Sequence, residues 1–255
     1  MSTTRSASPP APATDTALLL CAHGARGVAG AASAHAQALD ASGRFAAVEA
    51  CALYGEPELE AALDHLSAPK ARLVPFMMAE GYTLDTLRRR VAAHPKGARV
   101  EIARAVGAHP ALTGLIAGKA RDGCGAVGWP PAGTALLLVG HGTRKHAASA
   151  ATAEAHAARL RESGGFAEVA TAYLDDDPAV PDALAGLSAP RCLVVGFFTD
   201  AGNHGREDVP ALLADCAMPT RYAGPIGPDA ALRQVILQQA DGAAPSVLDG
   251  AGALR

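Results

Sequence analysis

Residues 17–27 read ALLLCAHGARG and residues 135–145 read ALLLVGHGTRK, so an apolar run followed by His-Gly occurs twice in the chain. A longer match joins residues 45–76 to residues 166–197, and the second copy carries a Ser-Gly-Gly insertion at 163–165. Self-similarity over such a length is typical of a chain built from two copies of one structural unit. Each unit has about 115 residues, an ordinary size for a domain.

The repeat predicts the domain organisation. We expect an N-terminal domain over residues 17–121 and a C-terminal domain over residues 134–240, joined by a Gly/Pro-rich linker at 122–133. Residues 1–16 are rich in Ser, Thr, Pro and Ala and predict a disordered lead-in, while the small and polar residues 241–255 predict a frayed tail.

Each unit alternates short apolar runs with Ala-rich stretches of helical character. Continuous apolar runs bounded by turns indicate strands that are buried on both faces. Strands that alternate with helices favour a parallel sheet covered by helices on both sides. The predicted fold is therefore α/β, with two tandem Rossmann-like three-layer domains, parallel sheets and a cleft between the domains. The expected strands are 18–21, 48–53, 72–77 and 100–103 in the first unit, and 136–139, 169–174, 192–198 and 220–223 in the second.

The composition disfavours several classes of function. The formal net charge is -3 and aromatic residues make up only 4%, so we expect no nucleic acid partner. The first apolar run is too short for a signal peptide or a membrane span, so we expect no membrane association. The five cysteines include no C-x-x-C pair, which disfavours a disulfide framework and favours a reducing, cytoplasmic location. Nucleotide binding is disfavoured because the first strand is followed by neither G-x-G-x-x-G nor a Walker lysine loop.

Three polar side chains follow three expected strands of the second unit, at the point where each strand ends. His141 follows the first strand, Asp175 the second and His204 the third. Because neighbouring parallel strands lie about 5 Å apart, residues in their end loops can converge on one point. Two imidazoles and one carboxylate suit a first-row divalent metal, and such a set leaves coordination positions open.

Other interpretations of these residues stay open. A single His-Gly after a strand can be a turn histidine that caps a helix. Asp175 is followed by Asp176 and Asp177, and any of these carboxylates could serve as a helix N-cap.

The first unit retains only part of the set. His23 matches His141, but Thr83 stands where the second unit has His204, and Tyr54 stands where it has Asp175. His23 could act as a proton relay beside the metal, or it could simply pack. Glu80 could lend a carboxylate across the cleft.

Basic and apolar side chains flank the same loops. Arg26, Arg144 and Arg206 are either solvated surface charges or guanidinium groups for substrate carboxylates. The pairs Met77-Met78 and Phe197-Phe198 end the third strands, as core residues or as a floor beneath a flat ligand.

Three motifs occur in a fixed order in the second unit: His-Gly-x-Arg, then Tyr-Leu-Asp-x-x-Pro, then Gly-x-His-x-x-x-Asp-Val-Pro. Together they resemble the class II chelatases, which are the CbiX and SirB sirohydrochlorin chelatases with their CbiK and ferrochelatase relatives. The resemblance covers nearly all of residues 17–240. It implies a bilobal fold without an organic cofactor, and insertion of a divalent metal substrate, cobalt or iron, into sirohydrochlorin or a related tetrapyrrole of cobalamin or siroheme biosynthesis.

The resemblance also implies roles for individual residues. It assigns catalytic and metal-binding roles to His141 and His204, and a metal-binding role to Asp175, where the family commonly has Glu. SirB-like chains carry the histidine pair in the N-terminal unit, whereas this chain carries it in the C-terminal unit, as CbiK-like proteins do. A non-catalytic carrier of metal or tetrapyrrole in the same cleft is the alternative function. The sequence leaves the choice of metal and the oligomeric state open.

Overall fold

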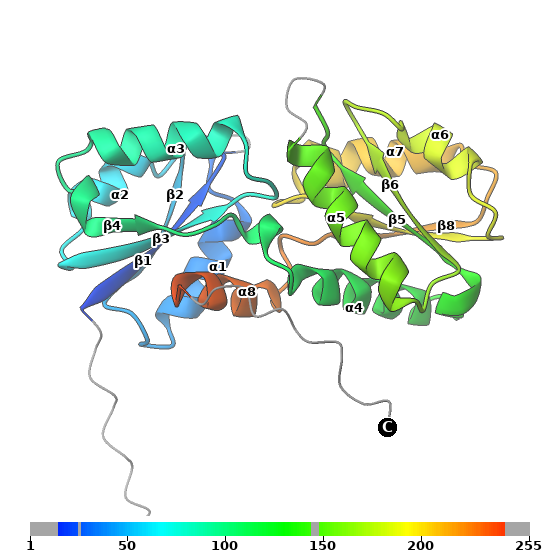
Figure 1. Ribbon diagram of the computed structural model, residues 1–255, viewed down its shortest axis with the longest axis horizontal. Helices are drawn as coiled ribbons and strands as arrows, with labels where there is room; N and C mark the ends of the chain where they lie inside the picture. Colours follow the sequence, from blue (N-terminus) through cyan, green and yellow to red (C-terminus); the bar gives the residue numbers. More distant parts are fainter. Residues whose placement is uncertain (1–14, 25–26, 144–147, 243–255) are drawn as a thin grey trace, which may run out of the picture.

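The computed structural model describes residues 15–24, 27–143 and 148–242. The described chain forms two lobes that lie side by side, each built around one four-stranded parallel sheet (Figure 1). The sheet of the N lobe has the order β2-β1-β3-β4. Its strands are β1 (Thr16–Ala22), β2 (Val48–Ala52), β3 (Lys70–Phe76) and β4 (Val100–Ile102).

The sheet of the C lobe repeats this topology with the order β6-β5-β7-β8, again all parallel. The predicted α/β fold with two parallel sheets is therefore confirmed. The peptide bonds Glu56-Pro57 and Asp177-Pro178, at matching places of the two lobes, are both cis. The strands of the C lobe are β5 (Ala135–Gly140), β6 (Glu168–Tyr173), β7 (Cys192–Gly196) and β8 (Thr220–Pro225).

The apolar runs form central strands because both of their faces are buried. In β1, Leu18 and Leu20 pack into the core that is shared with the C lobe, whereas Leu19 and Cys21 pack against the outer helices of the N lobe. This alternation follows from the two-residue period of a strand. The outer layer consists of α2 (Leu59–His65) and α3 (Tyr82–Ala93) in the N lobe, and α6 (Val180–Ala185) and α7 (Val209–Ala214) in the C lobe.

The last helix of each sequence unit packs on the sheet of the other lobe. Helix α4 (Leu112–Gly125) contacts β7 and β8, while α8 (Leu232–Ala240) contacts β3. Figure 1 shows α8 beneath the N lobe, beside α1 (Ala31–Asp40), and α4 beneath the C lobe, near α5 (Ala148–Ser163). Each spatial lobe is therefore completed by a helix from the other sequence half.

Two details differ from the expected boundaries. β1 begins at Thr16, inside the expected lead-in, whose residues 1–14 lie outside the described chain together with residues 243–255 of the tail. The expected linker at 122–133 starts within α4, because the helix continues to Gly125.

Short helical turns complete the fold: the 3-10 turns η2 (Gly97–Arg99), η3 (Val106–Ala108) and η4 (Pro131–Gly133), and the π-helical turn η5 (His204–Asp208).

Two buried histidines join the lobes in a matched pair. The Nε2 atom of His35 lies 2.8 Å from the carbonyl oxygen of Gly227, and the Nε2 atom of His156 lies 2.7 Å from that of Gly107. Each bond runs from the first helix of one lobe to the turn that follows the last strand of the other. A continuous apolar core also extends through both lobes. The lobes are thus held together by packing and by two equivalent hydrogen bonds.

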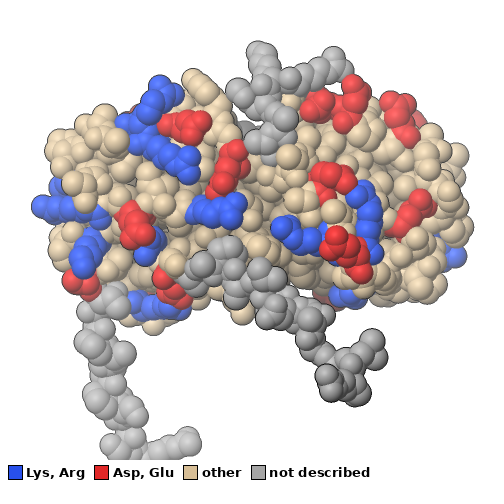
Figure 2. Space-filling model, in the orientation of Figure 1, with Lys and Arg blue, Asp and Glu red and all other residues tan. Residues whose placement is uncertain are grey.

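The surface carries both signs of charge. Figure 2 shows Lys and Arg interspersed with Asp and Glu over both lobes on the face in view. Among the described residues, none of the helices is both long enough and apolar enough to cross a bilayer.

Candidate active site

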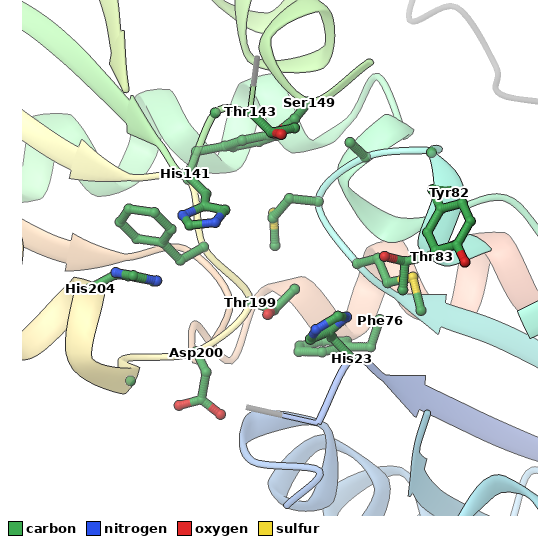
Figure 3. A pocket seen from close by; sticks show the side chains of 18 of the residues that line it. His23, Phe76, Tyr82, Thr83, His141, Thr143, Ser149, Thr199, Asp200 and His204 are labelled. Carbon is green, nitrogen blue, oxygen red and sulfur yellow. The ribbon is translucent and has the colours of Figure 1, made fainter. Parts of the chain in front are cut away.

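A cavity of about 630 Å³ lies between the lobes, beyond the carboxyl ends of β1, β3, β5 and β7. This is the place where open α/β sheets bind ligands, because the loops diverge where the strand order reverses. Both lobes contribute to its wall, and Figure 3 shows His141 and His204 on one side and His23 on the other.

The imidazole rings of His141 and His204 lie together in this cavity. Their ring centroids are 4.8 Å apart, with 34° between the ring planes. His141 is held by its backbone, since its carbonyl oxygen accepts hydrogen bonds from the amides of Leu174 and Asp175 at 3.1 and 2.9 Å. The loops after β5 and β6 are thereby joined at the point where the imidazole leaves the sheet.

His204 begins the π-helical turn η5, and its Nδ1 atom lies 2.7 Å from the Oδ2 atom of Asp208. A carboxylate accepts the Nδ1–H of a neutral imidazole and leaves the Nε2 lone pair available to a metal ion. Single π-helical turns occur often at functional sites. The turn brings Asp208 back beside His204, so the site includes a partner that fixes the orientation of this ring.

Asp175 lies beside His141, with 3.4 Å between its Oδ2 atom and His141 Nε2, and its side chain is 63% exposed. The helix-capping interpretation of these acids finds no support, because α6 has Ala179 at its N-cap without a side-chain hydrogen bond. Asp176 instead accepts a hydrogen bond from the amide of Asp177. The structure thus brings Asp175 toward the histidine pair.

His23 faces the pair from the N lobe. Its ring packs edge-on against Tyr54, with centroids 5.1 Å apart, and Thr83 lines the same wall. Burial, and to a smaller extent the charge of His141, lowers the pKa of His23 below its usual value. His23 therefore remains an unprotonated base at neutral pH.

Glu80 and Arg206, two further polar residues expected at the site, are not among the described residues that line the cavity. Glu80 forms an ion pair with Arg104, with 3.1 Å between Oε1 and Nε. Arg206 is exposed on the η5 turn, two residues after His204. Arg26 and Arg144 lie outside the described residues.

Apolar side chains form the floor of the cavity. Phe76 and Met77 contribute from the end of β3, and Phe197 and Phe198 from the segment that follows β7. All four are also buried. Met77, Phe197 and Phe198 are thus core residues that also line the cavity, and the partly buried Met78 lines it beside them.

Within the described residues, no three His, Cys, Asp or Glu side chains lie close enough together to hold a metal ion by themselves. The predicted set of His141, His204 and Asp175 is therefore not assembled as three ligands, and the histidine pair is the nitrogen donor set that the geometry supplies.

Comparison with known proteins agrees with this arrangement of fold and site. The CbiX family profile matches residues 17–122 and 135–243, which are the two repeated units. This chain belongs to the CbiX family. The match confirms the resemblance to class II chelatases.

Members and structural neighbours of the family span most of the chain. A probable sirohydrochlorin cobaltochelatase of Halobacterium salinarum is 26% identical over 94% of this chain and 95% of its own length. The structure of CbiX, described as the terminal enzyme of siroheme biosynthesis in denitrifying bacteria, superposes with a TM-score of 0.72 and 25% identity, covering 89% of this chain and 99% of that one.

A multi-domain protein of Deinococcus radiodurans with structural similarity to chelatases superposes with a TM-score of 0.75 and 28% identity. The match covers 88% of this chain but 54% of that protein, so the present chain spans about half of its length.

Sequence reasoning missed two side chains of this CbiX-family site. Asp208 was visible in the sequence as an acid four residues after His204, a spacing that brings side chains together on a helical turn. Asp200 also lines the cavity, but its partner is the amide of Ala31 in the other lobe. No local pattern could have indicated that contact.

Proposed function

We propose that this chain is a sirohydrochlorin chelatase, which inserts Co²⁺ or Fe²⁺ into sirohydrochlorin or a related tetrapyrrole of cobalamin or siroheme biosynthesis. The family membership and the cobaltochelatase name of the Halobacterium relative support the reaction. The observation that carries the proposal is the convergence of His141 and His204 in the cavity between the lobes.

The histidine pair presents the metal substrate. Imidazole nitrogen suits cobalt and iron, and two nitrogen ligands leave coordination positions for the nitrogens of the macrocycle. Asp208 holds His204 with Nε2 available to the metal, and Asp175 supports His141 from the rim. A metal that must be released is bound only moderately, as expected for a pair of half-exposed side chains.

The reaction must also remove protons. Exchange of two pyrrole N–H protons for one divalent ion leaves the charge of the macrocycle unchanged, so two protons have to leave the ring. His23 lies on the wall opposite the pair, and its lowered pKa keeps it unprotonated at pH 7. We assign it as the proton acceptor on the second face of the macrocycle, which takes one pyrrole proton at a time and releases it to solvent before it accepts the second.

The cavity suits a flat apolar ring with charged edges. Its volume lies within the ordinary range of small-molecule sites, and the aromatic and methionine floor offers contact for a ring face. Arg206, together with Arg26 and Arg144 outside the described residues, is proposed to meet substrate carboxylates at the rim.

The test is anaerobic incubation of sirohydrochlorin with Co²⁺ or Fe²⁺, followed by the visible absorbance of the macrocycle. We expect many equivalents of product per equivalent of protein. His141→Ala and His204→Ala should each abolish insertion, whereas His65→Ala, which removes an exposed imidazole at the end of α2, should retain it. Unchanged turnover in both site variants would refute the assignment.

A non-catalytic carrier of metal or tetrapyrrole is the alternative use of the cavity. A carrier would convert or bind a single equivalent, so the amplitude of the same absorbance change separates the two functions. A cytoplasmic location belongs to the proposal as well, because all five cysteines are free thiols.

A further inference from the structure

Asp200 connects the two walls of the cavity through a single carboxylate. It lies in the segment between β7 and His204, and it lines the cavity. Its Oδ2 atom accepts a hydrogen bond of 2.7 Å from the amide of Ala31, the first residue of α1 in the other lobe. Its Oδ1 atom accepts a second bond of 2.7 Å from the amide of Ala201. Figure 3 shows the carboxylate pointing away from the C lobe toward the blue segment of the N lobe.

The N-terminus of α1 is shaped to receive this carboxylate. Gly30 occupies the N-cap with φ 56° and provides no side-chain cap of its own. A Cβ atom at this position would lie 1.7 Å from the Oδ2 atom of Asp200, so only glycine leaves room for it. A carboxylate at a helix N-terminus is favoured by the unpaired amides and by the helix dipole. Most helices are capped by a residue next to their first turn in the sequence, whereas α1 is capped by a residue of the opposite lobe.

The place of this contact distinguishes it from the other bonds between the lobes. The rings of His35 and His156 lie against Phe76 and Phe197, so their hydrogen bonds run beneath the cavity floor. Asp200 instead lies on the cavity wall, four residues before His204, and the helix that it caps follows the loop after His23. The first unit has Ala79 at the equivalent position, which carries no carboxylate that could form the same bond.

We propose that Asp200 is a positioning residue for metal insertion, which fixes the spacing between His204 on one wall and His23 on the other by capping α1 across the cleft. One charge-assisted hydrogen bond then fixes the distance between the loop that carries His204, the metal ligand, and the loop that carries His23, the proton acceptor. The inference rests on the proposed chelatase function. It adds a residue whose carboxylate is bonded to two backbone amides and which acts through the geometry of the cleft.

The first test compares Asp200→Ala with Asp40→Ala. Asp40 lies at the other end of the same helix, and its Oδ1 atom accepts a bond of 3.0 Å from the amide of Val48 within one lobe. Asp200→Ala loses the bond to Ala31 across the cleft together with the local bond to Ala201, whereas Asp40→Ala loses a single bond within one lobe. We expect Asp200→Ala to lower kcat roughly ten- to a hundredfold, the range for loss of a charged hydrogen bond, with Asp40→Ala unchanged in kcat and KM. Asp200→Asn should recover part of the rate, because its amide oxygen still accepts.

The second test uses Gly30→Ala, whose methyl group takes the place of the carboxylate. Alone it should reproduce the loss of kcat seen in Asp200→Ala. In the Asp200→Ala background it should cost little further rate, because the contact is already absent and the remaining backbone strain at φ 56° lowers stability. Such non-additivity in rate is the signature of a direct interaction. Additive losses of rate would overturn the proposal.

A third measurement does not depend on turnover. Small-angle scattering of the whole chain should show a larger radius of gyration for Asp200→Ala than for Asp40→Ala, because the lobes are less closely tied. If the wild type is active and Asp200→Ala has the same kcat, KM and scattering, the role of Asp200 is overturned. The proposed chelatase function is not affected by that outcome. A wild type that never turns over would overturn the chelatase function, while the scattering comparison would still decide whether Asp200 ties the lobes.

Discussion

The Nε2 atom of His156 lies 2.7 Å from the carbonyl oxygen of Gly107, so α5 of the C lobe is joined to the η3 turn of the N lobe. A carbonyl only accepts, which makes Nε2–H the donor and leaves Nδ1 to accept from the hydroxyl of Thr113, also at 2.7 Å. Both ring nitrogens are satisfied by the neutral form. Burial above all, with smaller effects of Arg159 and His109, lowers the pKa of His156 to about 4.

This pKa predicts that stability falls in mild acid. The unfolded chain binds a proton at His156 near its ordinary pKa of 6.5, whereas the folded chain resists protonation until about 4. The contribution is therefore complete above pH 6.5 and is lost as the pH falls toward 4, by an amount on the order of 3 kcal/mol. Urea unfolding at pH 7 and at pH 4.5 measures the difference.

The variant His156→Gln isolates this effect, because it removes the titrating group while it retains a donor. Its free energy of unfolding should depend less on pH across the same window. An equally steep pH dependence in the variant would show that other groups cause the loss.

Asp208 should control metal affinity through His204. Loss of a carboxylate that orients a metal-binding imidazole typically weakens binding ten- to a hundredfold. We expect Asp208→Ala to raise the Kd for Co²⁺ about tenfold or more, and Asp208→Asn to have a smaller effect because its amide oxygen can still accept from Nδ1–H. Titration with Co²⁺, followed by its visible absorption, checks both. Equal affinities in all three proteins would contradict the orienting role.

His23 should determine the behaviour of the enzyme in acid. Its pKa is lowered, chiefly by burial, so kcat/KM for the free enzyme should stay level on acidification through pH 6.5 and decline only below it. His23→Ala should lose roughly a hundredfold in rate, as expected for removal of a proton acceptor, and should lose this part of the acid limb. The pH profile of initial rates is the measurement. His65→Ala, with its distant imidazole, should keep the profile of the wild type, and an intact limb in His23→Ala would argue against the assignment.

Gly142 should be required for the placement of His141. It has φ 71°, and an added Cβ atom would lie 2.7 Å from the Cβ atoms of Tyr173 and Asp176. Gly142→Ala should therefore cost about 1–3 kcal/mol of stability and also impair insertion. Gly164→Ala is the matched control, because Gly164 has φ 66° with nothing within 4 Å of an added Cβ. It should lose stability through the backbone alone and keep its activity, as thermal unfolding and the absorbance assay would show.

Local patterns in the sequence were enough to predict the two-unit α/β fold and the position of the histidine pair. Apolar runs of strand length and the repeat are local patterns, and they fix where β5 and β7 end. Because parallel strands end at the same edge of a sheet, His141 and His204 had to converge once the strands were recognised. The family resemblance added the chemistry that such a pair performs.

The way in which the two units complete one another depends on long-range contacts that the folded protein alone reveals. The packing of α4 and α8 on opposite sheets, the bonds of His35 and His156, and the capping of α1 by Asp200 all join segments far apart in the chain. No periodicity encodes such contacts, because they exist only after the lobes have docked, and burial of a continuous apolar core drives that docking. Local sequence preferences thus determine the helices and strands. Long-range packing determines how the two walls of the cavity are arranged around the histidines.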